Sequence, residues 1–177
     1  MSGHPSVTIG FLGPTSVTVD GAAVVLTARR QRAVLAHLAL RAPHPVPPDQ
    51  LLDAVWGDDQ PSTGVRAVAF QISKLRSALE PDRIDEGSVI ITSAAGYALD
   101  VDPDHLDIHR FERLVSKARE LVTDDPARCR TSIDQALGLW RGRPFADLAD
   151  RPLLEDEIRR LEQRRLLARR TRAEALI

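Results

Sequence analysis

The sequence of 177 residues predicts an α+β chain, and three observations point to this fold class. Short β-branched runs separated by turn dipeptides occupy residues 7–26. Apolar residues recur at helical spacing over residues 29–79, and a glycine-marked hairpin pattern follows at residues 88–101. After the hairpin only helical spacing is found. We therefore expect two domains, residues 7–101 with strands and helices and residues 102–177 with helices alone.

The first expected elements are three short strands and one helix. The strands lie in the runs VTIGFL, SVTV and AVVL, which the turn dipeptides Gly13-Pro14 and Asp20-Gly21 separate. Helical spacing begins at Arg29 and continues to Leu40, and four prolines then form a rigid connection. The order of these elements predicts a small sheet that precedes a group of helices.

Two further helices and a hairpin complete the first domain. A short helix is expected over residues 49–55, after which the Trp56 indole would lie in the core. The next helix covers residues 62–79, with Ser62 as its N-cap. Its apolar stripe consists of Val65, Val68, Ile72, Leu75 and Leu79. Strands at 88–92 and 97–101 form a hairpin around a turn, and three helices followed by a hairpin make a winged helix.

The helix at residues 62–79 has the composition of a helix that enters the major groove of DNA. Between Pro61 and Leu79 there is no acidic residue. The face opposite the apolar stripe carries Thr63, Arg66, Gln71, Ser73, Lys74 and Ser77, with Arg76 on its flank. Such side chains donate to base edges and phosphates. The alternative interpretation is an ordinary solvated helix face.

The second domain is expected to be an all-α, tetratricopeptide-like array of antiparallel helices. Helices are predicted over residues 107–122 and 125–140, and a third from Asp150 to the end, where no stop signal occurs. We therefore expect a truncated domain. Cys129 lies on an apolar face and is interpreted as a small core residue. Residues 159–172 hold seven arginines and one acid. This string either meets DNA or an acidic polymerase surface, or is a charged face whose acidic partners lie on helices further downstream.

Composition excludes several classes of protein. A single cysteine allows no internal disulfide, and no apolar run approaches the roughly 20 residues that span a bilayer. We expect a cytoplasmic, nucleoid-associated protein without contact to membranes. No catalytic motif pairs a nucleophile with a base, so we expect neither an enzyme nor a cofactor. His105 and His109 have metal-compatible spacing, but no further ligands complete a site, and no metal is expected. The net charge of −1 is low for a DNA-binding protein, although Arg29, Arg30, Arg32 and Arg41 form a local basic group.

Several motifs together resemble those of the Streptomyces antibiotic regulatory protein family. They are GFLGP at Gly10–Pro14, VTVDG, RRQRAVLAHL, LLDAVWGDDQP, ISKLRSAL, GYALD, FERLVSKARELV and ALGLWRGRPFADL. The resemblance implies an OmpR-like winged helix joined to a bacterial transcriptional activator domain. It also implies an activator that binds direct repeats in double-stranded DNA near promoters, as a homodimer on DNA. RNA polymerase, including its sigma subunit, would be the protein partner, and secondary-metabolite (antibiotic) genes would be the targets.

The resemblance also assigns roles to residues by position. Bases would be read by Arg66, Gln71, Ser73, Lys74 and Ser77. Phosphates would be held by Arg29, Arg30, Arg32, Thr63 and Arg76, although Arg76 could instead pair with an acid in the turn after the helix. The wing residues are Thr92, Ser93 and Tyr97, and Ser93 stands where wings of the family typically carry an arginine. Phe70 is expected to pack against the wing rather than to read bases. The rival hypotheses are a protein-interaction scaffold and a sensor-regulator with a further C-terminal module.

Overall fold

The computed structural model describes residues 5–81, 88–148 and 152–175. The chain divides into two compact units. The first unit holds Met1–Ile9 and Ser16–His105, and the second holds Gly10–Thr15 and Leu106–Ile177. The expected division into the domains 7–101 and 102–177 stays a prediction. The segment Gly10–Thr15 differs from that expectation, because it packs with the second unit.

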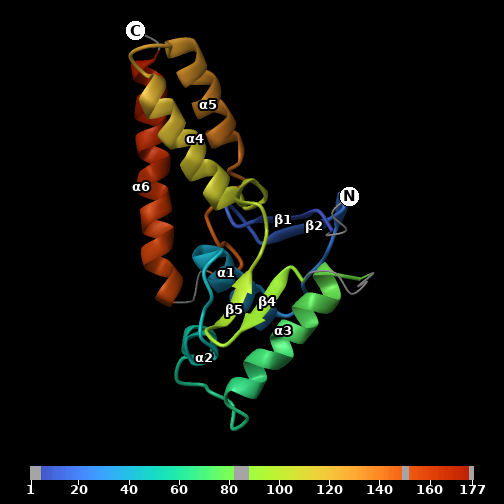
Figure 1. Cartoon of the computed structure of the whole chain (residues 1–177). Helices are drawn as coiled ribbons and strands as arrows, with labels where there is room; N and C mark the ends of the chain where they lie inside the picture. Colours follow the sequence, from blue (N-terminus) through green and yellow to red (C-terminus); the bar gives the residue numbers. More distant parts are fainter. Residues whose placement is uncertain (1–4, 82–87, 149–151, 176–177) are drawn as a thin grey trace. The chain divides into compact units, whose positions relative to one another are not determined.

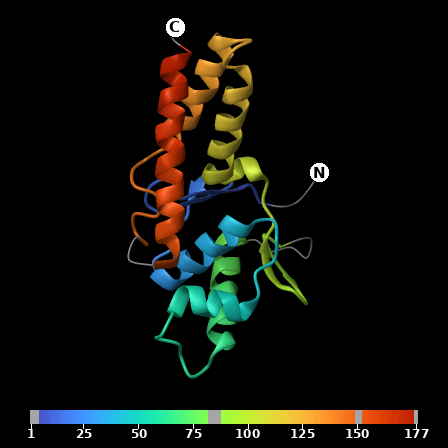
Figure 2. The same cartoon turned by 90° about the vertical axis from the view of Figure 1, so that its left-hand side faces the viewer.

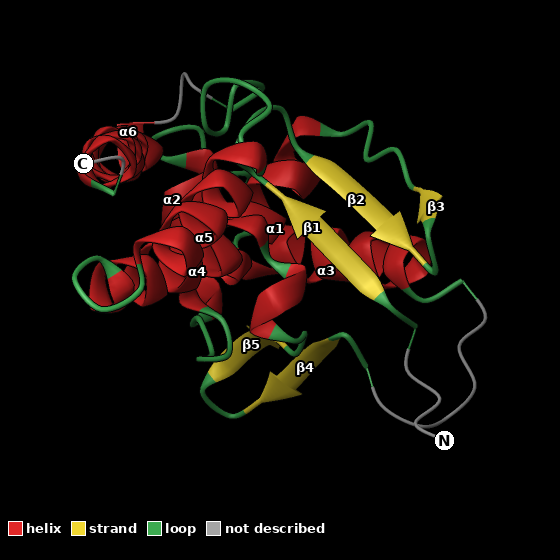
Figure 3. Ribbon diagram, turned by 90° about the horizontal axis from the view of Figure 1, so that it is seen from above, coloured by secondary structure: helices red, strands yellow, loops and turns green. Residues whose placement is uncertain are grey.

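The first unit contains two small sheets and three helices, so the predicted α+β class and winged helix are confirmed (Figure 1). Its elements are β1 (Val7–Gly10), β2 (Ser16–Val19), β3 (Ala22–Ala23), α1 (Arg29–Arg41), α2 (Pro48–Trp56), α3 (Val65–Leu79), β4 (Ile90–Ser93), β5 (Gly96–Leu99) and η1 (Pro103–His105). In the view of Figure 3, α1 and α3 lie between the sheet that contains β1 and β2 and the hairpin β4–β5.

The N-terminal sheet has the order β1-β2-β3. Val17 and Val19 alternate with half-buried residues in β2, which is the pattern of a strand with one covered face. The Asp20-Gly21 turn is confirmed, because both residues have positive φ angles of 49° and 82°. The third strand is shorter than predicted. Only Ala22–Ala23 pair with β2, and the chain leaves the sheet before Val25, which is 81% exposed.

The core of the first unit lies among its three helices. Trp56 is buried, as predicted, at the end of α2. Four of the five residues in the predicted stripe of α3 are buried, namely Val68, Ile72, Leu75 and Leu79. The prediction is wrong for Val65, which is 48% exposed. This residue stands at the first helical position, where the helix has not yet reached the core.

Helix α3 begins three residues later than predicted, and Ser62 is not its cap. The residue before the helix is Gly64, with a φ of 54° and no side-chain cap. Residues 62–64 form a turn instead, in which the carbonyl of Thr63 accepts from the amide of Arg66 at 3.2 Å. The first amides of α3 therefore bond to backbone oxygens, which removes the need for a capping side chain.

The hairpin pairs Ile90 with Leu99 and Ser93 with Gly96 in antiparallel register. Its second strand also pairs with the connection between α1 and α2. The amide of Val46 donates to the Tyr97 carbonyl at 2.8 Å, and the reverse bond measures 3.0 Å. A Cβ atom on Gly96 would overlap the carbonyl of Val46, so glycine is required here. The hairpin is thereby attached to the helical core.

The second unit consists of α4 (Asp107–Leu121), α5 (Pro126–Gly138) and α6 (Pro152–Glu174). These three helices lie side by side in Figures 1 and 2. Cys129 is fully buried, as predicted, in the core of this unit. The expected helix start at Asp150 lies outside the described residues. Among the described residues, no helix combines the length and apolar character needed to cross a membrane.

The segment Gly10–Thr15 packs against residues of the second unit. The rings of Phe11 and Phe145 stack with centroids 5.2 Å apart, and both are buried. The Asp107 carboxylate accepts the amides of Phe11 at 2.8 Å and Leu12 at 2.9 Å. Burial raises the pKa of Asp107, whereas these two hydrogen bonds and the charge of Arg141 act to lower it. The carboxylate thus accepts the hydrogen bonds of two amides that, in a sheet, would donate to carbonyls of a neighbouring strand.

Replacing Asp107 by alanine is expected to lower the free energy of unfolding of the second unit by about 1–3 kcal/mol. Two buried backbone amides would lose their acceptor. Urea unfolding followed by the fluorescence of Trp140 in a Trp56→Phe background would report on this unit. Asp124→Ala, which removes an exposed carboxylate, serves as the control and should change stability by less than about 0.5 kcal/mol. Equal stabilities of the two variants would contradict the role given to Asp107.

Candidate nucleic-acid interface

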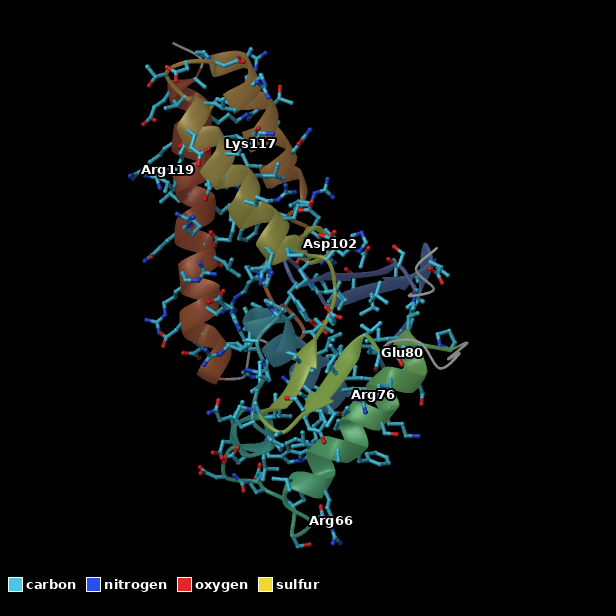
Figure 4. The ribbon with its side chains drawn as sticks, viewed as in Figure 1. Arg66, Arg76, Glu80, Asp102, Lys117 and Arg119 are labelled. Atoms are coloured by element: carbon cyan, nitrogen blue, oxygen red, sulfur yellow. The ribbon has the colours of Figure 1, made fainter. Side chains whose placement is uncertain are left out.

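Helix α3 presents a polar face to the outside of the first unit. Its buried residues recur every three or four positions, so the residues between them point away from the core. Four of the predicted base-reading residues meet on this outward face and are exposed: Arg66, Ser73, Lys74 and Ser77. Figure 4 shows Arg66 at the start of α3 and Arg76 near its other end. The helix contains no acidic residue.

Gln71, the fifth predicted base-reading residue, occupies a different position. It is half-buried and follows Phe70 on the flank of α3, between the outward face and the buried stripe. Ser77 is exposed, but its hydroxyl donates to the carbonyl of Ser73 at 3.1 Å. The arrangement therefore leaves Arg66 and Lys74 as the charged donors of the outward face.

Phe70 lies on the outward face, and the expectation that it packs against the wing is wrong. Its side chain is 58% exposed, and the ammonium of Lys74 lies 5.5 Å from the centre of its ring. The expectation comes with the positions carried over from the family resemblance, and the exposure of the ring contradicts it. The spacing indicates that the ring is exposed, because Phe70 is four residues from both Arg66 and Lys74 and therefore lies on the same helix face as they do.

Arg76 connects α3 to the wing. Its Nε and Nη2 atoms donate to the carbonyl of Ile90 at 3.0 and 2.5 Å, and Nη2 also lies 2.7 Å from the Thr92 hydroxyl. The sequence leaves a choice between a phosphate and an acidic partner for this residue. The bonds in the structure go to β4, so a phosphate contact would share the same guanidinium.

Glu80, which is not among the site residues expected from the sequence, holds the strand that enters the hairpin. Its Oε1 atom accepts from the Ser88 hydroxyl at 2.7 Å and from the amide of Val89 at 2.5 Å. Glu80 is 6% exposed and stands one helical turn after Arg76. We call Arg76 and Glu80 the wing clamp. The signal in the sequence is an acid directly after a helix without acids.

The wing residues have separate structural tasks. Thr92 is exposed and bonds to Arg76, whereas Tyr97 is half-buried and pairs with Val46. The Ser93 hydroxyl accepts from the amide of Ala95 at 3.2 Å and lies 3.3 Å from the Gly96 carbonyl. Ser93 therefore stabilises the hairpin turn, which is a role that an arginine could not take over.

The basic end of α1 contains the other predicted phosphate ligands. Arg29 and Arg30 are exposed, and the Arg30 guanidinium lies 5.5 Å from the ring of Trp56. Arg32 is half-buried and donates from Nη1 to the carbonyls of Leu26 at 2.7 Å and Thr27 at 2.9 Å. Arg32 thus fixes the entry to α1. Thr63 is exposed in the turn before α3.

The arginine string of α6 forms ion pairs inside the second unit. Its partners on the other helices are Glu112 for Arg160 and Arg164, both at 2.7 Å, and Asp134 for Arg172 at 2.6 Å. Within α6, Arg159 pairs with Asp156 and Arg160 with Glu157, both at 2.6 Å. Arg165 lies 4.5 Å from the ring of Trp140. The hypothesis that the acidic partners lie on helices further downstream is wrong for Arg160, Arg164 and Arg172, because the acids are on α4 and α5.

Metal chemistry receives no support from the described part of the chain. Within it, no group of three His, Cys, Asp or Glu side chains lies close enough to hold an ion. His109 is half-buried, and burial lowers the pKa of its imidazole.

Comparison with known proteins agrees with the two parts of the chain. Residues 21–99 match the family described as "Transcriptional regulatory protein, C terminal", and residues 106–177 match the "Bacterial transcriptional activator domain". The chain is 30% identical over 164 residues to the transcriptional regulator RedD of Streptomyces coelicolor, and 32% identical over 166 residues to the regulatory protein DnrI of Streptomyces peucetius. The chain belongs to the Streptomyces antibiotic regulatory protein family. The names of these relatives describe regulatory proteins, as expected.

The match covers most of this chain but only part of each relative. It includes 92% of this chain and 47% of RedD, and 89% of this chain and 60% of DnrI. A solved structure of Mycobacterium tuberculosis EmbR in complex with a low-affinity phosphopeptide is also similar. It is 30% identical with a TM-score of 0.90, and the match covers 97% of this chain and 45% of that one. The chain thus spans roughly half the length of these three proteins.

Replacing Arg76 by alanine is expected to accelerate hydrogen exchange of the hairpin amides about tenfold or more. The hydrogen bonds of one charged group to β4 would be lost, and such bonds contribute about 1.5–3 kcal/mol each. Exchange followed by nuclear magnetic resonance would measure the effect at Ile90 and Tyr97. Arg66→Ala removes an exposed arginine from the same helix and should leave these rates unchanged. Equal rates in both variants would disprove the clamp.

Proposed function

We propose that the chain is a sequence-specific activator whose first unit binds double-stranded DNA with α3 in the major groove. The observation that supports this most directly is the outward face of α3, where exposed donors gather without an acid. Arg66 and Lys74 have the chemistry to donate to the O6 and N7 atoms of guanine. Gln71, Ser73 and Ser77 are the remaining candidates for base contacts.

Phosphate contacts would set the position of the protein on DNA. Arg29 and Arg30 are exposed at the start of α1, and Thr63 is exposed before α3. Arg32 and Arg76 also carry guanidinium groups, which can bind phosphate while they hold the backbone. The wing clamp supports the proposal because it fixes the hairpin to α3, so both elements can meet one DNA surface together. Contacts of this kind supply affinity that falls as salt increases.

The broader role follows from the family. Members bind direct repeats near promoters, which requires two protomers side by side in head-to-tail order and no two-fold interface. We expect such a homodimer on DNA, contact with RNA polymerase including its sigma subunit, and a location at the nucleoid in the cytoplasm. Relatives from Streptomyces support secondary-metabolite genes as targets. The second unit would provide the surface for self-association or polymerase contact.

The competing function is that of a scaffold or sensor-regulator in which the helical half has the main role. The nearly neutral charge of the first hundred residues and the absence of an arginine at Ser93 favour it. The EmbR structure contains a phosphopeptide, and the match spans 45% of that protein. Phosphopeptide binding is therefore a property to test in the full-length relatives.

Selection of bound duplexes from a random DNA pool at near-physiological salt tests the proposal. An enriched direct repeat with half-sites about one helical turn apart is the expected result. Binding without enrichment that vanishes as salt rises would reduce the interaction to charge attraction and favour the scaffold.

Replacing Lys74 by alanine is expected to weaken binding to the selected duplex by about 1–3 kcal/mol and to relax selection at one base pair. Arg30→Ala should weaken binding to selected and random duplexes equally, because a phosphate contact carries no sequence information. Lys117→Ala is the matched control, since Lys74 and Lys117 are the two lysines of the chain and Lys117 is exposed on α4 (Figure 4). A loss of equal size on both duplexes for Lys74→Ala would reassign Lys74 to the phosphates.

A further inference from the structure

Phe70 is a large apolar side chain on the outward face of α3, and hydrogen bonding to DNA does not use it. Within the described part of the chain, the large exposed apolar residues are Val25, Val65, Phe70, Ile91 and Leu166, and Phe70 is the aromatic one among them. Its side chain is 58% exposed in a well-formed helix. A ring left in water loses the free energy that burial would give, so a partner that covers it gains affinity.

The neighbours of Phe70 define what this partner is. Arg66 precedes it by four residues, Lys74 follows it by four, and Ser73 and Ser77 lie at the same helical face. The ring therefore stands in the middle of a set of hydrogen-bond donors. An apolar protein surface would have to bury these donors without acceptors, which is costly. A major groove offers acceptors around an apolar group, because thymine presents a 5-methyl group beside the acceptors of neighbouring bases.

We infer that Phe70 is a specificity-determining residue that contacts the 5-methyl group of a thymine in the major groove. This inference rests on the proposed DNA-binding function and deepens it. The ring of Phe70 also lies 5.5 Å from the ammonium of Lys74, so the two side chains form a cation–π pair. The pair orders the flexible lysine and directs its donors to the base next to the thymine contact.

The geometry of α3 also restricts where the thymine lies. Four residues of an α-helix span about 6 Å along its axis, and consecutive base pairs are about 3.4 Å apart. The thymine read by Phe70 is therefore within about two base pairs of the base read by Lys74. This relation gives the inference a positional prediction, in addition to a choice of base.

Single thymines in the selected duplex, replaced one at a time by deoxyuridine, provide the test. Deoxyuridine lacks only the 5-methyl group. The wild-type protein is expected to bind about three- to fivefold more weakly when one particular thymine is replaced, because one methyl contact is lost. Phe70→Ala should bind the thymine and uracil duplexes equally, and Phe70→Leu should retain part of the difference. The sensitive thymine should lie within about two base pairs of the position whose selection Lys74→Ala relaxes.

The controls separate this inference from the proposed function. Lys117→Ala should keep the full difference between the thymine and uracil duplexes. Because Phe70 is exposed, Phe70→Ala is expected to leave the thermal unfolding midpoint almost unchanged, which a melting experiment would verify. An enriched sequence without any uracil effect, or with the same effect in Phe70→Ala, would overturn the inference and leave the proposed function intact. Failure of the pool to enrich any sequence would overturn both.

Discussion

The packing of α3 against the other helices of the first unit is the interaction on which the candidate interface depends. Val68, Ile72, Leu75 and Leu79 are buried, and their spacing fixes the rotation of the helix about its axis. Once this rotation is set, every remaining position of α3 has a defined direction. The outward set, the flank with Gln71 and the side toward the wing all follow from the burial of the same four residues.

The position of the wing also depends on α3. Hydrogen bonds from Arg76 hold the strand β4, and Glu80 holds the residues that precede it. The opposite strand is held by Val46 through a pair of backbone bonds. Two charged residues and one backbone bridge therefore determine where a short hairpin lies. A two-stranded hairpin has little stability by itself, so these attachments give the wing a defined position.

The second unit shows how a basic segment, residues 159–172, can be compatible with a protein of nearly neutral charge. The arginines of α6 meet Glu112 on α4 and Asp134 on α5, and Arg165 covers the ring of Trp140. These interactions use the charges to join the helices of the unit. A basic string in a sequence is therefore a poor indicator of nucleic acid unless the positions of nearby acids are known.

The sequence alone determined the order of the elements, the buried stripe of α3, the core positions of Trp56 and Cys129, and the absence of acids from α3. Each of these follows from periodicity or composition within a short window, which the linear sequence contains. The tertiary structure decided the partners of Arg76, Arg32 and Glu80, the exposure of Phe70, and the packing of Gly10–Thr15 with the second unit. These properties depend on residues that are distant in the chain, as in the bonds from Phe11 and Leu12 to Asp107. A long charged side chain has several partners of similar free energy within reach, and only the packed chain selects one of them.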